Sequence, residues 1–154
     1  MTDSEIEAAV RDVITAHRER EAPLMPMLHA IQEEIGYIPD RAVPMLADAM
    51  QTTAAEIYGT ISFYHDFKRV PQGRHVLRLC RAESCQAMGS ADLHDEIQQR
   101  LGISWGETTP DGKVTLEAVY CLGLCACSPS AMMDQRPMGR VDVDRVLAAV
   151  AEAR

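Results

Sequence analysis

The chain has 154 residues, of which 47% are hydrophobic and 25% are charged, as is typical of a soluble globular protein. Its formal net charge of -8, with no cluster of basic residues, argues against nucleic acid or an anionic membrane as a partner. The N-terminus is acidic and amphipathic, and no apolar run approaches the length of about 18 residues that a membrane-spanning helix needs. We therefore expect a cytoplasmic chain without a signal peptide or membrane insertion.

The first part of the chain shows the periodicity of amphipathic helices. Ser4 with Glu7, and Thr53 with Glu56, form capping boxes that predict the starts of the first and last helices. Gly36 follows the second apolar stripe, where a helix C-terminus is commonly closed. The predicted helices cover roughly residues 5–20, 24–35, 40–50 and 53–68. Together they predict a small helical bundle over residues 1–70.

From residue 71 onward, strand-like and helix-like segments alternate. The predicted strands are residues 75–80, 113–121 and a short apolar run at 130–134. The predicted helices are residues 91–101 and an amphipathic closing helix at 141–153, while residues 111–113 and 135–140 are predicted to be turns. The fold class is therefore predicted to be α+β, with an N-terminal helical bundle (1–70) followed by a compact α/β domain (71–154).

All five cysteines lie in this second part, in two loops that each follow a predicted strand. Cys80 and Cys85 follow the first strand, and Cys121, Cys125 and Cys127 follow a later one. Because rigid strands position the loops at their ends, we expect the two loops to meet at one edge of the sheet. In a cytosolic protein, grouped cysteines bind metal or carry out redox chemistry more often than they form disulfides. Four thiolates from two loops can enclose a metal site.

Cysteine spacing restricts the kind of site without fixing it. The pairs have four and three intervening residues, which matches neither the bacterial two-cluster run nor the plant-type ferredoxin spacing. A Rieske centre needs histidine ligands, which neither loop contains. The absence of a C-x-x-C motif argues against a thiol-disulfide oxidoreductase. Spacing alone leaves a [2Fe-2S] cluster and a structural zinc ion open.

Two further groups of residues have an expected role. Arg81 and Glu83 lie between the first two cysteines, where Arg81 is expected to favour the reduced form of a negatively charged cluster and Glu83 to oppose it. The aromatic residues Phe63, Tyr64 and Phe67 are interpreted as core or interface packing.

The motif "CRAESC", followed 35 residues later by "CLGLCACSP", resembles the thioredoxin-like [2Fe-2S] ferredoxin family, which includes a small NADH-dehydrogenase subunit of complex I. The segment "IYGTISFYHDF" is similar to the family's helical part, so the resemblance covers nearly the whole chain. It implies a thioredoxin-like domain behind the cluster, with Cys80, Cys85, Cys121 and Cys125 as ligands. Cys127 departs from the family pattern, in which this position is commonly not cysteine.

Within this family the loop "CRAESCQAMG" most resembles the gamma subunits of soluble, molybdenum-containing, NAD-dependent formate dehydrogenases. The resemblance implies a non-catalytic electron-transfer subunit beside a flavoprotein subunit that holds FMN and the NAD site. The molybdenum cofactor and further iron-sulfur clusters would then lie in partner chains. The absence of a G-x-G-x-x-G fingerprint and of a P-loop agrees with this expectation. The alternatives are the equivalent subunit of complex I or of an NAD-linked hydrogenase and, in a different class, a zinc-stabilised interaction module.

Overall fold

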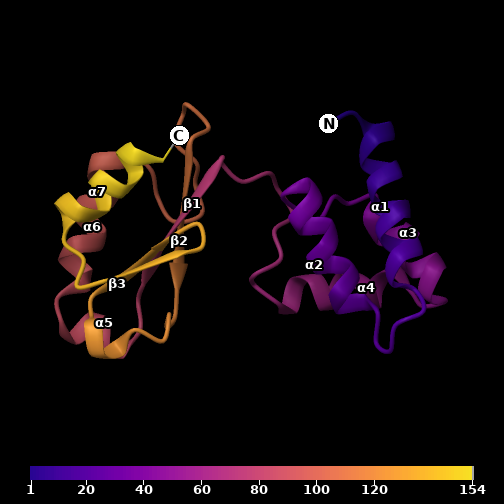
Figure 1. Ribbon diagram of the computed structural model, residues 1–154, viewed down its shortest axis with the longest axis horizontal. Coiled ribbons are helices and arrows are strands. Elements are labelled where there is room, and N and C mark those ends of the chain that lie inside the picture. The colour runs from indigo at the N-terminus through magenta and orange to yellow at the C-terminus, as the bar shows by residue number, and fades with distance from the viewer. Residues whose placement is uncertain (154) are drawn as a thin grey trace. The chain divides into compact units, whose positions relative to one another are not determined.

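The computed structural model describes residues 1–153 and has two compact units, Met1–Pro71 and a second unit that begins at Gln72 (Figure 1). The first unit is helical, and the second combines a sheet with helices. This arrangement confirms the predicted α+β class. Among residues 1–153, no helix combines the length and apolar character needed to cross a membrane.

The first unit is built from four amphipathic helices that share one apolar core. They are α1 (Asp3–His17), α2 (Leu24–Ile35), α3 (Ala42–Met50) and α4 (Ala54–Phe63). Each helix contributes side chains that are fully shielded from solvent, such as Val10, Leu28, Leu46 and Ile57. Gly36 closes α2 in the left-handed conformation, as its position after the apolar stripe predicted.

The two helix starts that were predicted from capping boxes have different outcomes. The box of Thr53 with Glu56 is present at α4 and confirms the prediction. At α1 the prediction is wrong, because Thr2, rather than Ser4, has the extended backbone of a capping residue. The Thr2 hydroxyl accepts a hydrogen bond from the Glu5 amide at 3.4 Å, and the Glu5 carboxylate accepts one from the Thr2 amide at 2.6 Å.

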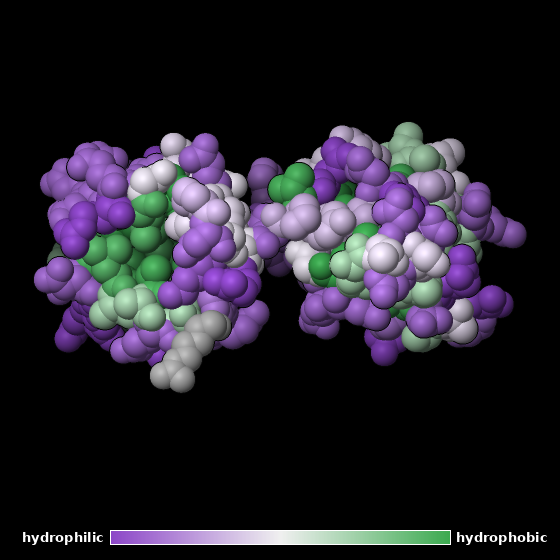
Figure 2. All heavy atoms as spheres, turned by 90° about the horizontal axis from the view of Figure 1, so that it is seen from above, coloured by the Kyte–Doolittle hydropathy of each residue, from purple (hydrophilic) through white to green (hydrophobic). Residues whose placement is uncertain are grey.

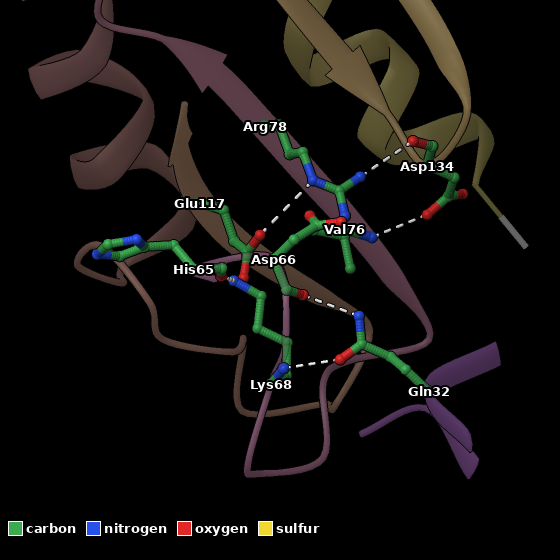
Figure 3. A network of polar contacts seen from close by, with 8 residues as sticks. All are labelled: Gln32, His65, Asp66, Lys68, Val76, Arg78, Glu117 and Asp134. Atoms are coloured by element: carbon green, nitrogen blue, oxygen red, sulfur yellow. Dashed lines mark hydrogen bonds and ion pairs between the residues drawn. The ribbon is translucent and has the colours of Figure 1, made fainter. Parts of the chain in front are cut away.

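Helix α4 ends at Phe63, four or five residues before the predicted end at residue 67 or 68. Tyr64 is extended, and the chain then turns so that Phe67 returns to the core with 6% of its surface exposed. Gln32 stabilises this return, since its side-chain amide donates to the Asp66 carbonyl at 2.8 Å and its carbonyl accepts from the Lys68 amide at 2.7 Å (Figure 3). Phe67 confirms the packing interpretation, whereas Phe63 is 74% exposed.

The second unit contains a four-stranded mixed sheet with the order β2-β1-β3-β4. Its elements are β1 (His75–Cys80), α5 (Glu83–Ala87), α6 (Ser90–Leu101), β2 (Val114–Val119), the 3-10 turn η1 (Cys125–Cys127), β3 (Ser130–Met133), β4 (Arg136–Gly139) and α7 (Val143–Glu152). Strands β1 and β2 are parallel, and β3 is antiparallel to both β1 and β4. The short helix α5 was not predicted.

The predicted turn at residues 135–140 is instead a two-residue turn followed by strand β4. Met133 pairs with Arg136, so only Asp134 and Gln135 form the connection. Pro137 suggested a turn, but β4 is an edge strand, where a missing amide donor is tolerated. The Asp134 carboxylate accepts a hydrogen bond from the Val76 amide at 2.8 Å and thereby attaches the turn to β1 (Figure 3).

The second core lies between the sheet and helices α6 and α7, which run beside each other on one face (Figure 1). Leu77 and Leu116 from the strands pack with Ile97 of α6 and Val146 of α7. On the β1 and β2 strands, Arg78 pairs with Glu117 at 3.6 Å and donates to the Asp134 carbonyl at 3.2 Å (Figure 3). On the face seen in Figure 2, the second unit has a hollowed apolar area between polar rims.

Candidate functional site

The two cysteine loops leave the same edge of the sheet because the strands before them are parallel. Cys80, the last residue of β1, pairs with Val119, the last residue of β2. The ladder continues one step further, since the Arg81 amide donates to the Val119 carbonyl at 2.7 Å. Cys121 follows two residues after β2 ends. The chain direction therefore brings together the two loops that were expected to meet.

The first loop holds its two thiols below the surface. Cys80 is 2% exposed at the end of β1, and Cys85 is 1% exposed in α5. The Cys80 thiol lies close enough to that of Cys85 to help lower its pKa. Strand β3 begins beside this pair, with the Ser130 hydroxyl 3.5 Å from the Cys85 sulfur. The hydroxyl of Ser128, just before the strand, lies 3.6 Å from the same sulfur.

The second loop presents its thiols to solvent. Cys121 and Cys125 are exposed, and their sulfur atoms lie 3.6 Å apart. The loop turns tightly here, because Cys121 has a φ of 115° and Gly123 a φ of 74°, in the region that L side chains rarely adopt. The Gly123 amide donates to the Cys121 sulfur at 3.3 Å. Backbone strain of this kind concentrates at functional sites.

Serine hydroxyls connect the two loops. Ser84, in α5, donates to the Cys125 carbonyl at 3.0 Å, and Ser128 donates to the same carbonyl at 2.8 Å. The two hydroxyl oxygens are 2.7 Å apart. Neither this role of Ser84 and Ser128 nor the contact of Ser130 with Cys85 was predicted from the sequence. A signal was present in "SPS", because alternate residues entering a strand point to the same side.

The four thiols lie close enough to influence one another's ionisation. A hydrogen bond with Cys121, followed by the charge of Cys121 and smaller effects of burial, Cys85 and Cys80, raises the pKa of Cys125. Burial works against ionisation of Cys85, but interactions with Ser130, Ser128 and Cys80 outweigh it and lower the pKa of that thiol. The site thus combines four soft ligands with nearby hydrogen-bond donors, a donor set that suits iron and inorganic sulfide.

The arrangement of the thiols can be compared with the needs of a single zinc ion. Among residues 1–153, no three cysteine, histidine or acidic side chains are gathered closely enough to hold a single metal ion. A structural zinc site needs four ligands at about 2.0–2.3 Å from one ion. A zinc ion can also take its four thiolates from two separate loops, so the arrangement of the loops alone does not separate zinc from a [2Fe-2S] cluster.

Cys127 faces a different neighbourhood from the other cysteines. Its carbonyl accepts a hydrogen bond from the Arg140 amide at 2.6 Å, beyond the end of β4. A Cβ atom added at Gly139 would lie 2.6 Å from the Cβ of Cys127, so this residue packs directly against β4. Within the described part of the chain, no hydrogen bond joins the Cys127 thiol to another cysteine.

Arg81 lies in the first cysteine loop, but its side chain extends toward α6. Its guanidinium carbon is 5.1 Å from the centre of the Trp105 ring, and the His94 ring packs edge-on against the same tryptophan. Burial, together with the positive charge of Arg81, lowers the pKa of His94. The arginine charge is therefore partly directed at the Trp105 and His94 pair.

Comparison with known proteins identifies related sequences. The model of the thioredoxin-like [2Fe-2S] ferredoxin family matches residues 10–154. The chain is 35% identical over 130 residues to a subunit of the NADH-quinone oxidoreductase of Pseudomonas aeruginosa, covering 84% of this chain and 78% of the relative. It is 31% identical over 134 residues to the HndA subunit of the NADP-reducing hydrogenase of Solidesulfovibrio fructosivorans, covering 87% and 78%.

A solved structure supports the same relationship. The chain superimposes on an NAD+-reducing [NiFe]-hydrogenase in the air-oxidised state with a TM-score of 0.71 and 28% sequence identity. The match covers 88% of this chain but 24% of the hydrogenase chain, so it spans about a quarter of that longer protein. The thioredoxin-like fold inferred from the cysteine motifs is thereby confirmed.

Proposed function

Because the chain belongs to the thioredoxin-like [2Fe-2S] ferredoxin family, we propose that it is the electron-transfer subunit of an NAD-dependent formate dehydrogenase complex. The cofactor of this family is a [2Fe-2S] cluster. We assign its ligands to Cys80, Cys85, Cys121 and Cys125. The observation that carries the assignment is the meeting of the two cysteine loops at the ends of two parallel strands, where a hydrogen bond from Ser84 to the Cys125 carbonyl joins them.

The two cysteine pairs have different tasks in this proposal. When bound, a [2Fe-2S] cluster takes up and releases one electron at a time. Cys80 and Cys85, at 2% and 1% exposure, keep water away from one side of the site. Cys121 and Cys125 lie at the surface, where the distance to a redox partner is shortest. The chain itself then needs no substrate site and acts without catalysing a reaction.

The proposed partner is a flavoprotein subunit that holds FMN and the NAD site. Apolar side chains stand exposed next to the cysteine loops, with Tyr120 at 74% and Met88 at 61% exposure. In the helical unit Phe63 is also 74% exposed. Exposed aromatic and methionine side chains are enriched in protein interfaces. Relatives that are named as subunits of an oxidoreductase and of a hydrogenase support a role in a larger assembly.

The choice of formate dehydrogenase depends on the loop "CRAESCQAMG", which resembles the gamma subunits of the molybdenum-containing enzymes. The similarities to known proteins favour a second candidate, the equivalent subunit of an NADH-quinone oxidoreductase or of an NAD-linked hydrogenase. The two candidates share the cluster and the flavoprotein partner. They differ in the protein that supplies electrons to the flavoprotein or takes them from it.

The cluster is tested by chemical analysis of the chain after anaerobic purification. We expect a brown protein with about two irons and two acid-labile sulfides per chain, the composition of one [2Fe-2S] cluster. Its EPR signal should appear only after reduction. A colourless protein that contains zinc and lacks sulfide would support the zinc-stabilised module instead, and an oxidised three-iron signal would contradict the ligand set.

The complex is tested by copurification from the source cell with a tag on this chain. We expect a flavoprotein and a molybdenum-containing subunit, and formate-dependent reduction of NAD+ by the purified assembly. Copurification of a nickel-containing subunit with hydrogen-dependent activity would contradict the formate assignment. Copurification of membrane subunits with NADH-dependent quinone reduction would contradict it as well. Both of those results would leave the cluster assignment intact.

A further inference from the structure

The buried side of the site contains a serine hydroxyl that contacts a cysteine sulfur. Ser130 is the first residue of β3 and is 3% exposed. Its hydroxyl oxygen lies 3.5 Å from the Cys85 sulfur. Across the described residues 1–153, this thiol is the one hydrogen-bond partner of the Ser130 hydroxyl. Such a buried donor is costly unless its partner is always present.

The neighbouring serines are engaged in a different way. Ser84 and Ser128 each have one hydroxyl proton, and both oxygens lie within hydrogen-bond distance of the Cys125 carbonyl and of each other. Their two protons are used to join the two loops. Ser128 also lies 3.6 Å from the Cys85 sulfur, where it accepts rather than donates when Cys85 carries a proton. Ser130 is therefore the serine whose proton is free for that sulfur.

A cysteine that ligates iron is a thiolate and accepts hydrogen bonds only. We propose that Ser130 donates a hydrogen bond to the Cys85 thiolate and thereby raises the reduction potential of the cluster. Negative charge on the ligand sulfurs increases when an electron is added, so the hydrogen bond becomes stronger in the reduced state. Ser130 acts through Cys85 and is a positioning and tuning residue. The inference deepens the proposed function, since it depends on Cys85 being a ligand.

Strand pairing explains why the hydroxyl is held in place. Ala131 pairs with Leu79 of β1, so Ser130 stands beside the end of that strand, where Cys80 lies. Ser130 also pairs with Gly139 of β4. Its pairing with β4, the pairing of the next residue with β1 and its burial hold the backbone of this serine in place, so its side chain has little freedom to leave Cys85. A fixed donor costs no reorganisation when the charge on the sulfur changes.

The test is an EPR-monitored redox titration of the full chain with its cluster. We expect Ser130→Ala to retain the parental absorption spectrum and to lower the ratio of reduced to oxidised cluster, at a fixed potential near the parental midpoint, by up to about tenfold, which corresponds to ~59 mV for one electron. Ser130→Thr keeps the hydroxyl and should stay within about twofold of the parental ratio. Ser128→Ala, the matched control, should shift the ratio less than Ser130→Ala.

The outcomes separate this inference from the function it depends on. A parental chain that contains no [2Fe-2S] cluster would overturn the proposed function before any variant is made. A Ser130→Ala chain with an intact cluster and an unchanged midpoint would overturn the tuning role alone. Ser130→Gly serves as a second removal of the hydroxyl. If both variants lose the cluster, Ser130 has a structural role and the inference is overturned as well.

Discussion

The two cysteine pairs of this protein occupy opposite environments within one site. Cys80 and Cys85 are buried and lie among serine hydroxyls, whereas Cys121 and Cys125 are exposed on a tight turn that contains Gly123. The first pair is attached to regular structure, since one member ends β1 and the other lies in α5. The second pair is held by loop geometry and a backbone amide.

This difference separates two requirements of an electron carrier. The buried pair lies beside the Ser130 hydroxyl, which we propose tunes the potential of a bound cluster. The exposed pair gives a partner access, because electron exchange needs a short path through little intervening protein. A site that was buried on all sides would be well tuned but poorly accessible. The asymmetry is therefore expected of a subunit that exchanges electrons across its own surface.

Removing one buried ligand should have the largest effect. We expect Cys85→Ser to retain less than about a tenth of the parental iron and visible absorption, since even the loss of an outer-shell partner commonly reduces metal affinity by about 10–100-fold. Cys121→Ser should also lose the cluster or change its spectrum strongly. Cys127→Ser is the matched control and should keep a near-parental cluster, because Cys127 packs against β4. Iron and sulfide analysis measures all three.

Loss of the cluster in the Cys127→Ser control would change the assignment of the fourth ligand. If Cys127→Ser abolished the cluster while Cys125→Ser left it unchanged, the fourth ligand would be Cys127. The comparison between a buried and an exposed pair would then no longer hold, because Cys127 is only partly exposed.

The difference in solvent exposure between the two cysteine pairs can be measured in the chain without its cluster. We expect iodoacetamide to modify Cys121 and Cys125 at least about tenfold faster than Cys80 and Cys85, since a local opening that costs about 1.4 kcal/mol slows a reaction by about that factor. The raised pKa of Cys125 means that its thiolate forms at higher pH than that of an ordinary cysteine. Its modification rate should therefore keep rising at pH values where a free cysteine has levelled off.

Peptide mass spectrometry over a series of pH values would give both results. Equal modification rates for the four thiols would show that the buried pair opens readily in the cluster-free chain. Half-maximal reaction of Cys125 at or below the pH found for free cysteine would contradict the effect of the neighbouring Cys121.

Disturbing the contact between Cys127 and β4 should have an effect of intermediate size, on the free energy of unfolding. Gly139→Ala would bring a Cβ within 2.6 Å of the Cys127 Cβ and 3.1 Å of its carbonyl oxygen. We expect a loss of about 1–3 kcal/mol in the free energy of unfolding, as is typical of overpacking. Combining it with Cys127→Gly should recover part of that loss. Gly59→Ala is the control, because a Cβ there meets no atom within 4 Å.

Thermal and denaturant unfolding measure these free energies. An unchanged stability in Gly139→Ala would mean that η1 can move away from β4. Cys127 would then have enough freedom to approach the other thiols, and the third cysteine of the second loop would again be a candidate ligand.

The meeting of the two loops was predictable because it depends on local signals. Cys80 and Cys121 each follow a strand-like run, and the ends of neighbouring parallel strands lie at one edge. The role of Ser130 was not predictable in the same way. It depends on β3 returning antiparallel beside β1, and this pairing joins residues that are far apart in the sequence. Propensity and spacing contain little information on such long-range order.

At two other segments the structure differs from the sequence prediction, and the physical cause is visible in each. Helix α4 was predicted to continue to residue 68, but the contacts of Gln32 with Asp66 and Lys68 hold the chain in a turn after Phe63. The segment "QRPMGR" at residues 135–140 was predicted to form a turn, but its proline is tolerated in an edge strand. In both places tertiary contacts overrode the local pattern.

The smallest expected effect is the change in midpoint potential on substitution of Arg81. From the sequence, the charge of this residue was expected to act on the cluster. The structure places its guanidinium over Trp105, at 5.1 Å from the ring centre, and toward His94. Arg81 is half-buried against Trp105, and salt in the surrounding solvent weakens the field of a charge that is not fully buried. We therefore expect Arg81→Gln to lower the midpoint potential by less than about 20 mV, which is roughly a twofold change for one electron. Glu83→Gln should raise it by a similarly small amount, because it removes a negative charge from the same loop. Redox titration of both variants checks the sign and the size. A decrease of more than about 60 mV in Arg81→Gln would show that the guanidinium leaves Trp105 and acts directly on the bound cluster.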